Sequence, residues 1–169
     1  MADVVPQQDL HRIVMTCIVY NAEGKFLATK RAPTKKVYPN KWTVPGGGLE
    51  PSDYADVPKT TADAWYQVVE SALRREVKEE VNVEIGKPEF LLDLIFIRPD
   101  GIPVLTLSYY ALYKGGDVVL EEGDATEFRW VTAEEAKQLD FIEGIAEEIE
   151  MVDEILKGNP NPLFEIRKG

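Results

Sequence analysis

A mixed β-sheet with helices packed on its faces, an α/β (α+β) fold, is the architecture that this sequence predicts. Short runs rich in branched residues, which are typical of strands, are joined by turn signals of the hairpin kind. Two other segments, 68–81 and 141–156, carry apolar residues at helical spacing instead. Because helices interrupt the strand runs, the sheet is expected to be mixed.

One domain is expected to contain all 169 residues, a length sufficient to bury a core. Apolar content of 44% and charged content of 29% are ordinary for a globular protein. No internal repeat and no interdomain linker is evident. Residues 1–9 are expected to form a loose leader before the first strand.

The first part of the chain predicts a hairpin followed by a loop and a short strand. Ile13–Tyr20 is rich in branched residues, Asn21–Gly24 is a turn signal, and Lys25–Arg31 is the expected partner strand. A basic, proline-marked loop follows over Ala32–Lys41, and Trp42–Val44 is predicted to be a short strand.

The middle of the chain predicts one amphipathic helix over Val68–Val81. Apolar residues recur there every three or four positions, which places them on one side of a helix. The residues of this stripe are Val69, Ala72, Leu73, Val77 and Val81.

The last part of the chain predicts three further strands and two helices. Turn signals at 99–101 and 114–117 separate the strands, which are expected at Glu89–Arg98, Val104–Tyr113 and Glu127–Val131. A capping threonine, Thr132, with Glu135 three residues on, predicts a helix start. The final helix is predicted over Phe141–Leu156 and ends at Gly158, with these residues facing inward: Ile142, Ile145, Ile149, Val152 and Ile155 or Leu156.

A cluster of carboxylates on the predicted helix over Val68–Val81 is the main functional signal. Glu76, Glu79 and Glu80 project from one side of it, because residues three and four apart are neighbours on a helix. Such crowding is repulsive unless a divalent cation is bound, and Mg²⁺ prefers carboxylate oxygens. A glycine-rich turn over Gly46–Gly48 is expected to bring backbone groups to the same ion or to a phosphate.

These residues resemble the signature of the Nudix hydrolase family. Its second half, Arg-Glu-aliphatic-x-Glu-Glu-x-Gly-aliphatic, is similar to Arg75–Val83, and its glycine end is similar to Gly46–Glu50. The resemblance continues outside the signature in Trp42–Pro45 and Glu127–Val131, and it covers roughly residues 10–140. It implies the Nudix α/β/α sandwich with a mixed sheet.

Two departures from the signature stand out. Asn82 replaces the final glycine, and asparagine is the non-glycine residue that best tolerates a left-handed backbone. The spacer before the helix is also too long, with 54–66 as the expected insertion. That insertion is expected to lengthen the helix or to form a flap over the substrate. It leaves Asp53 or Gln67 in the place of the first acidic residue.

The resemblance implies a role for each residue of the cluster. Glu76 and Glu80 are the leading metal ligands, and Glu79 is a further ligand or orients the attacking water. The carbonyl of Gly46 is expected to reach the metal, with Gly47 as the alternative. Arg75 pairs with a catalytic glutamate and holds its rotamer. The implied cofactor is Mg²⁺, with Mn²⁺ as the alternative.

A general base and groups that bind the substrate complete the expected site. Glu122 or Glu121 is the candidate base, Glu127 comes next, and an acidic surface turn remains the alternative. Arg31 and Lys41, with Lys30, are candidate cations for phosphates. The candidates for stacking on a base are Phe128, Trp130, Tyr38, Trp42 and Tyr109.

Composition excludes several classes of protein. A net charge of −11 argues against a protein that coats nucleic acid. The single cysteine, Cys17, excludes an intramolecular disulfide and is expected in the core, and the single histidine, His11, excludes a His-dependent triad or zinc site. No apolar run predicts a bilayer span and no signal-peptide pattern is present, so a cytoplasmic location without a membrane partner is expected.

The function expected from the resemblance is Mg²⁺-dependent hydrolysis of a phosphoanhydride in a nucleoside diphosphate linked to another group. A nucleoside triphosphate is the leading substrate, and a nucleotide sugar or ADP-ribose is the alternative within the family. A module that senses nucleotides without cleaving them is the rival from another class. The C-terminal helix leaves a scaffold role or a homodimer open as well.

Overall fold

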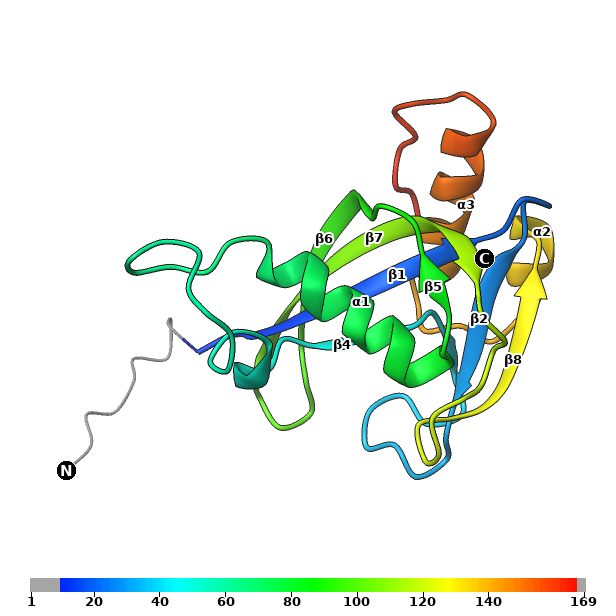
Figure 1. The fold of residues 1–169 in the computed structure, drawn as a ribbon. Helices are drawn as coiled ribbons and strands as arrows, with labels where there is room; N and C mark the ends of the chain where they lie inside the picture. Colours follow the sequence, from blue (N-terminus) through cyan, green and yellow to red (C-terminus); the bar gives the residue numbers. More distant parts are fainter. Residues whose placement is uncertain (1–9, 167–169) are drawn as a thin grey trace.

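The computed structural model describes residues 10–166, in which eight strands form one mixed β-sheet (Figure 1). The predicted leader at 1–9 lies outside the described residues. The strands are β1 (Arg12–Tyr20), β2 (Phe26–Arg31), β3 (Trp42–Thr43), β4 (Gly46–Gly48), β5 (Glu84–Ile85), β6 (Glu89–Ile97), β7 (Pro103–Gly115) and β8 (Ala125–Val131).

Two long parallel strands, β1 and β7, pair at the centre of the sheet. Their register runs from Arg12 opposite Val104 to Tyr20 opposite Leu112. All other pairs are antiparallel: β6 and β5 pair with β7, β4 and β2 with β1, and β8 and β3 with β2. Two neighbouring parallel strands need a long connection between them. The chain between β1 and β7 provides one, and it contains the helix over Val68–Val81. The prediction of a mixed sheet is confirmed.

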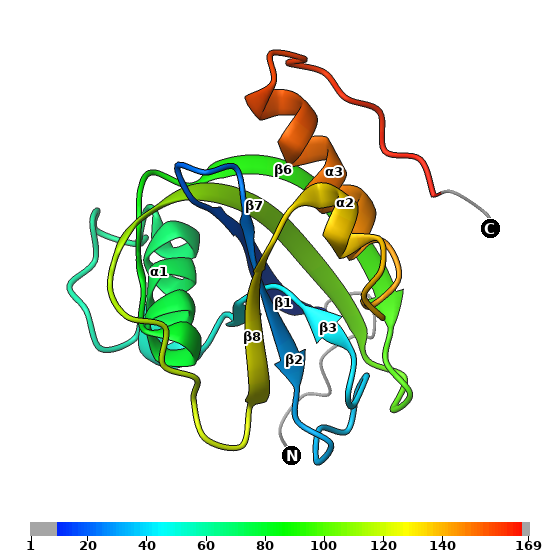
Figure 2. The ribbon, with the colours of Figure 1, turned by 90° about the vertical axis from the view of Figure 1, so that its right-hand side faces the viewer.

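Helices cover both faces of this sheet (Figure 2). The helix α1 (Val68–Val81) lies on one face, and α2 (Ala133–Ala136) and α3 (Ile145–Leu156) lie on the other. Alternate residues of β1 supply both cores, since successive strand side chains point to opposite faces. Met15 and Cys17 pack with the α1 stripe, whereas Ile18 packs with α3. The predicted α/β/α sandwich is confirmed.

Both ends of α1 lie where the sequence predicted them. The helix ends at Asn82, whose φ of 56° is left-handed, as expected for the residue that replaces glycine. Its amide side chain also donates to the carbonyl of Asp117, which fixes the turn after the helix. The stripe residues Ala72, Leu73, Val77 and Val81 are buried, and Val69 is partly buried.

Two local predictions were wrong, and one short strand was not predicted. The final helix begins at Ile145 rather than Phe141, because Phe141 forms a β-bridge with Trp42 and Gly144 enters the helix with a φ of 96°. The short strand β5 was not predicted, since two residues carry no periodicity. Gly46–Gly48 forms the strand β4 instead of a turn.

The single cysteine lies in the core. Cys17 is fully buried between the sheet and α1. Burial raises the pKa of its thiol to about 12, so the reactive thiolate is scarcely populated at neutral pH. The prediction of a core residue is confirmed.

Among residues 10–166, no helix has both the length and the apolar character that a membrane crossing requires.

Candidate active site

The strand β4 needs its glycines because three neighbours occupy the space where side chains would lie. A Cβ on Gly46 would overlap the backbone of β1 at Met15. A Cβ on Gly47 would overlap the carboxylate of Glu76, and one on Gly48 would overlap the guanidinium of Arg12. The lack of side chains therefore lets β4 pair with β1 while charged groups from other elements approach it.

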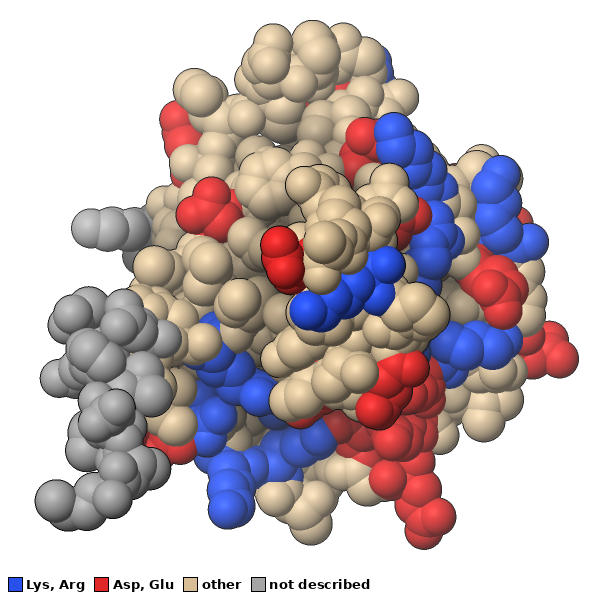
Figure 3. Space-filling view, turned by 60° about the vertical axis from the view of Figure 1, so that its left-hand side comes forward, with Lys and Arg blue, Asp and Glu red and all other residues tan. Residues whose placement is uncertain are grey.

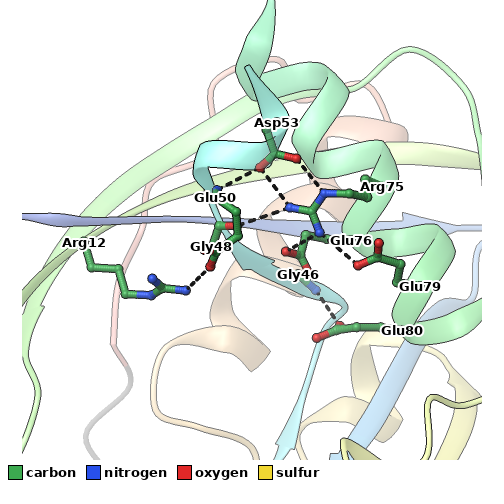
Figure 4. Close-up of polar contacts among 9 residues, drawn as sticks. All are labelled: Arg12, Gly46, Gly48, Glu50, Asp53, Arg75, Glu76, Glu79 and Glu80. Atoms are coloured by element: carbon green, nitrogen blue, oxygen red, sulfur yellow. Dashed lines mark hydrogen bonds and ion pairs between the residues drawn. The ribbon is translucent and has the colours of Figure 1, made fainter. Parts of the chain in front are cut away.

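Two carboxylates of α1 point toward β4. Glu80 accepts a hydrogen bond from the backbone N–H of Gly46, with 2.8 Å between nitrogen and oxygen (Figure 4). Burial raises the pKa of Glu80 to about 7, although this hydrogen bond lowers it. Burial also raises the pKa of Glu76. Two desolvated carboxylates on adjacent turns form a site that favours a proton or a cation.

Arg75 lies at the centre of the ion pairs on this side of α1 (Figure 4). Its Nε and Nη2 donate to the two carboxylate oxygens of Asp53 at 2.6 and 2.9 Å. Its Nη1 donates to Glu76 and to Glu79, both at 2.9 Å. A bidentate Arg–carboxylate pair fixes orientation as well as charge, so Arg75 joins the loop before α1 to the helix itself.

Asp53, one of the two candidates for the first acidic residue of the signature, is in contact with Arg75. Its side chain is 4% exposed and lies in a 3₁₀ turn over Pro51–Asp53. The hydrogen bonds from Arg75 lower its pKa. The alternative, Gln67, is exposed just before α1 and has no part in these contacts. Of the two candidates, Asp53 is therefore the one that contacts Arg75.

A cavity of about 690 Å³ opens beside these carboxylates. Glu76, Glu80 and β4 form one wall of it. The other lining residues include strand residues from β1, β2, β6 and β7, the start of α3, and residues of the loops 32–41 and 121–125. The cavity therefore lies on the α3 face of the sheet and ends at the Glu76–Glu80 pair.

The structure brings only some of the predicted site residues to this cavity. Arg31 lines it, and burial lowers the pKa of its guanidinium. Glu121 lines it too, and its backbone N–H donates to the carbonyl of Glu80 at 3.0 Å. Five of the predicted site residues do not line it: Arg75, Glu79, Glu122, Lys41 and Phe128. The reserve candidates Lys30, Glu127, Trp42, Trp130 and Tyr109 do not line it either.

Three of these residues, Lys41, Glu79 and Phe128, have other surroundings. Lys41 forms an ion pair with Asp140, and Glu79 is 52% exposed against Arg75. Phe128 is 40% exposed on β8. The reserve candidate for the base, Glu127, is paired with Arg129 and does not line the cavity. The sequence alone could not tell which side chains of these loops and strands point into the cavity and which point to solvent.

Several cavity residues were not selected from the sequence. Lys35 pairs with Asp124 at the cavity, and only its place in the basic loop signalled it. Arg12 reaches across β4 to Glu50 at 2.9 Å. Among the described residues, Nε of Arg98 is the one buried side-chain nitrogen or oxygen without a hydrogen-bond partner, and Arg98 also lines the cavity.

The cavity is lined by positively charged side chains although the chain as a whole is strongly acidic. The net charge is −11, yet one face of the molecule carries Lys and Arg side chains beside Asp and Glu side chains (Figure 3). Arg12, Arg31, Lys35 and Arg98 all line the cavity. An anionic ligand could therefore enter without facing carboxylates alone.

The donor set suits a hard divalent cation that retains water. Within residues 10–166, no three His, Cys, Asp or Glu side chains converge closely enough to hold a metal ion between them. Mg²⁺ in proteins commonly keeps several waters and binds through one or two carboxylates together with substrate phosphates. Glu76 and Glu80 supply two such carboxylates at the cavity wall. The residues therefore fit Mg²⁺ in chemistry and number.

The segment 54–66 does not contribute to the cavity. It precedes α1 without lengthening it, which overturns the first of its two predicted roles. It packs on itself instead: the indole of Trp65 donates to the carbonyl of Val57 and contacts the ring of Tyr54. None of its residues lines the cavity.

Trimming this loop from Ala55 to Thr61 is expected to leave kcat/KM within about twofold for every substrate turned over at the cavity, because exposed loops outside a site tolerate deletion. Steady-state kinetics over a substrate panel would check this. A changed order of substrate preference would instead support the predicted flap, since the loop would then have to close over the cavity during turnover.

The comparisons with known proteins identify the class to which this arrangement belongs. A model of the NUDIX domain matches residues 10–151 of the chain. The chain belongs to the Nudix family, and it is a Nudix hydrolase, an enzyme that acts on phosphoanhydrides.

Particular relatives agree with this family. Nucleoside triphosphatase NudI from Klebsiella pneumoniae (strain 342) is 29% identical over 137 residues, which are 75% of this chain and 86% of that protein. The MutT protein from Methanosarcina mazei Go1 has a TM-score of 0.64 at 20% identity, covering 88% of this chain and 96% of its own. The NUDIX domain of Shewanella oneidensis NrtR, solved with ADP ribose, has a TM-score of 0.66 at 17% identity, covering 92% and 95%.

Proposed function

We propose that the enzyme hydrolyses a nucleoside triphosphate at an internal phosphoanhydride, releasing pyrophosphate, with Mg²⁺ as cofactor. The observation that supports this most directly is the pair Glu76 and Glu80, which lies at the wall of a cavity that cations also line. The relatives named NudI, which are nucleoside triphosphatases, support the choice of substrate.

In this proposal Glu76 and Glu80 hold the cation, and the Gly46 N–H keeps the Glu80 carboxylate in place. Bound Mg²⁺ would neutralise phosphate oxygens and lower the pKa of the attacking water. Mn²⁺ has similar ligand preferences and is the alternative. Arg31 lies beside Glu80 and would hold a phosphate oxygen.

Arg75 and Asp53 position the carboxylates rather than touch the substrate. Arg75 does not itself line the cavity, and it fixes the rotamer of Glu76, which does, by a hydrogen bond of 2.9 Å. Asp53 in turn fixes Arg75 from the other side. Such partners of metal ligands typically affect activity by about ten- to hundredfold when they are removed.

Glu121 is the proposed general base, in place of Glu122. Glu121 lines the cavity next to Glu80, whereas Glu122 does not. Glu121→Gln is therefore expected to lower kcat by roughly a hundredfold, the usual range for a positioned base, with little change in the Mg²⁺ concentration at half-maximal rate.

Glu122→Gln is the matched control for that prediction, since it removes the same charge one residue away on the same turn, and its kcat should stay near that of the wild type. Both variants would be compared by initial rates over a Mg²⁺ titration. If Glu122→Gln were the slower enzyme, the base would be assigned to Glu122 and the proposed orientation of this turn rejected.

The alternative substrate is ADP-ribose or a nucleotide sugar. The NrtR domain that shares the fold was solved with ADP ribose, and ADP-ribose carries the same pyrophosphate linkage. The cavity of about 690 Å³ falls in the range of small-molecule sites and is large enough to leave this alternative open.

The test is chromatographic analysis of the products formed from nucleoside triphosphates, ADP-ribose, nucleotide sugars and dinucleotide polyphosphates, with Mg²⁺ and with EDTA. Product analysis is needed because hydrolysis of ADP-ribose or of a nucleotide sugar yields a nucleoside monophosphate and a sugar phosphate, not free phosphate or pyrophosphate. Pyrophosphate release from triphosphates that EDTA abolishes is the expected result. Turnover of ADP-ribose alone would replace the substrate assignment. Nucleotide binding without any turnover would favour the sensor, and turnover unaffected by EDTA would reject the cation.

A further inference from the structure

The helix α3 places one charged side chain among its apolar inward residues. Its buried positions are Ile145, Glu148, Ile149 and Val152. Glu148 is 3% exposed and lines the cavity. An apolar residue at this position would extend the core, so the packing of α3 gives no reason for a carboxylate there.

Within residues 10–166, this buried carboxylate forms no ion pair with a lysine or arginine. Among residues 10–166, the hydrogen-bond partner that Glu148 has is the hydroxyl of Ser108, which is itself fully buried. Its position in the first turn of α3 provides some stabilisation from the helix dipole. A buried carboxylate that lacks a positive partner is costly, and such groups concentrate where a ligand supplies the missing donors.

The sheet register fixes where this carboxylate lies relative to the Glu76–Glu80 pair. Gly46, whose N–H binds Glu80, is opposite Thr16 of β1, and Thr16 is opposite Ser108 of β7. Two strand spacings of about 4.8 Å therefore separate Gly46 from Ser108, or roughly 10 Å. A nucleotide with its phosphates near Glu80 could extend its base along this row to Glu148.

The walls of the cavity near Glu148 suit a flat, largely apolar ring. Leu94 of β6 lines it on the sheet side, and Ile142 and Ile145 line it near α3. Thr106 of β7 supplies a further polar atom beside this part of the cavity. Sites for small molecules typically combine such apolar walls with one or two polar groups that fix orientation.

We propose that Glu148 recognises the edge of the substrate's nucleobase, and that the site is built for a guanine-type base with two adjacent N–H donors. This rests on the proposed function and names its substrate class. An ionised carboxylate only accepts hydrogen bonds, so it matches the N1–H and 2-amino group of guanine together. Thymine and uracil carry carbonyls on both sides of their N–H, and these oxygens would face the carboxylate.

GTP and ITP provide the sharpest test, because hypoxanthine differs from guanine only by lacking the 2-amino group. The wild-type enzyme is expected to hydrolyse GTP with a kcat/KM at least about tenfold above that for ITP, since a site built for a hydrogen-bonded group rejects the analogue without it. UTP should be poorer than both. This comparison needs no variant, so it does not depend on how a substitution folds.

Glu148→Gln is expected to bring the GTP to ITP ratio close to one, because the amide places a donor where the 2-amino group needs an acceptor. The fall should come from GTP, with ITP hydrolysis little changed. Glu147→Gln is the matched control, since Glu147 is the preceding residue of α3 and does not line the cavity. It should keep the wild-type ratio. Thermal melting would confirm that both variants are folded.

The outcomes separate this inference from the proposed function. Triphosphates hydrolysed without preference between GTP and ITP, or a ratio unchanged in a folded Glu148→Gln variant, would overturn the role of Glu148 and leave the hydrolase intact. Preference for ATP or CTP that Glu148→Gln abolishes would keep Glu148 but reject the guanine assignment. Failure to hydrolyse any triphosphate would overturn the proposed substrate and this inference with it.

Discussion

Replacing Glu80 by glutamine is expected to lower kcat/KM for the substrate by roughly a thousandfold or more, because the variant loses a cation ligand and its charge where the phosphates bind. The amide keeps the shape of the side chain. It also removes a carboxylate that burial penalises, so the fold should not be weakened. Initial rates would measure the loss of activity.

A second measurement connects that loss with the cation. Mg²⁺ should raise the melting temperature of the wild type and have a much smaller effect on Glu80→Gln, because a ligand stabilises only the state that binds it. Glu84→Gln is a control that removes an exposed carboxylate from β5. Near-normal turnover in a folded Glu80→Gln variant would remove Glu80 from the active site.

Arg75→Ala is expected to lower kcat/KM by about ten- to hundredfold and the free energy of unfolding by about 3 kcal/mol. The stability effect arises because the variant leaves Asp53, whose side chain is 4% exposed, without its cation. The activity effect arises because Glu76 loses the donor that orients it. Chemical denaturation and steady-state kinetics would measure the two effects.

The loss of stability should depend on pH in a defined direction. Arg75 lowers the pKa of Asp53 below its ordinary value of 3.8, so the pair stabilises the fold fully above about pH 4 and loses this contribution as the pH falls through the folded-state pKa. Arg75→Ala should therefore lose most stability near neutral pH and approach the wild type in acid. Lys78→Ala, which breaks an exposed pair with Glu84, should cost well under 1 kcal/mol. An equal loss of unfolding free energy in Arg75→Ala and Lys78→Ala would show that the Arg75–Asp53 pair stabilises the fold no more than an exposed ion pair does.

Local periodicity and local chemistry were sufficient for the framework of this protein. The α1 stripe, the hairpin of β1 and β2 and the left-handed Asn82 each depend on residues within a few positions of one another, so the sequence determined them. The same holds for the carboxylates of Arg75–Glu80, since helical spacing alone places them on neighbouring turns. The family resemblance rested on this local signal.

The tertiary structure decided which of these residues meet. Asp53 and Arg75 are 22 positions apart, and only the folded 3₁₀ turn brings Asp53 rather than Gln67 to the guanidinium. The pairing of β4 with β1 required three glycines because of what lies against them, which no local pattern records. The position of Glu121, rather than Glu122, at the cavity and the burial of Glu148 against Ser108 likewise depend on long-range packing. Sequence therefore determined the kinds of groups available and their local spacing. Side-chain direction in loops, and contacts between distant strands, were fixed only when the sheet and its helices packed together.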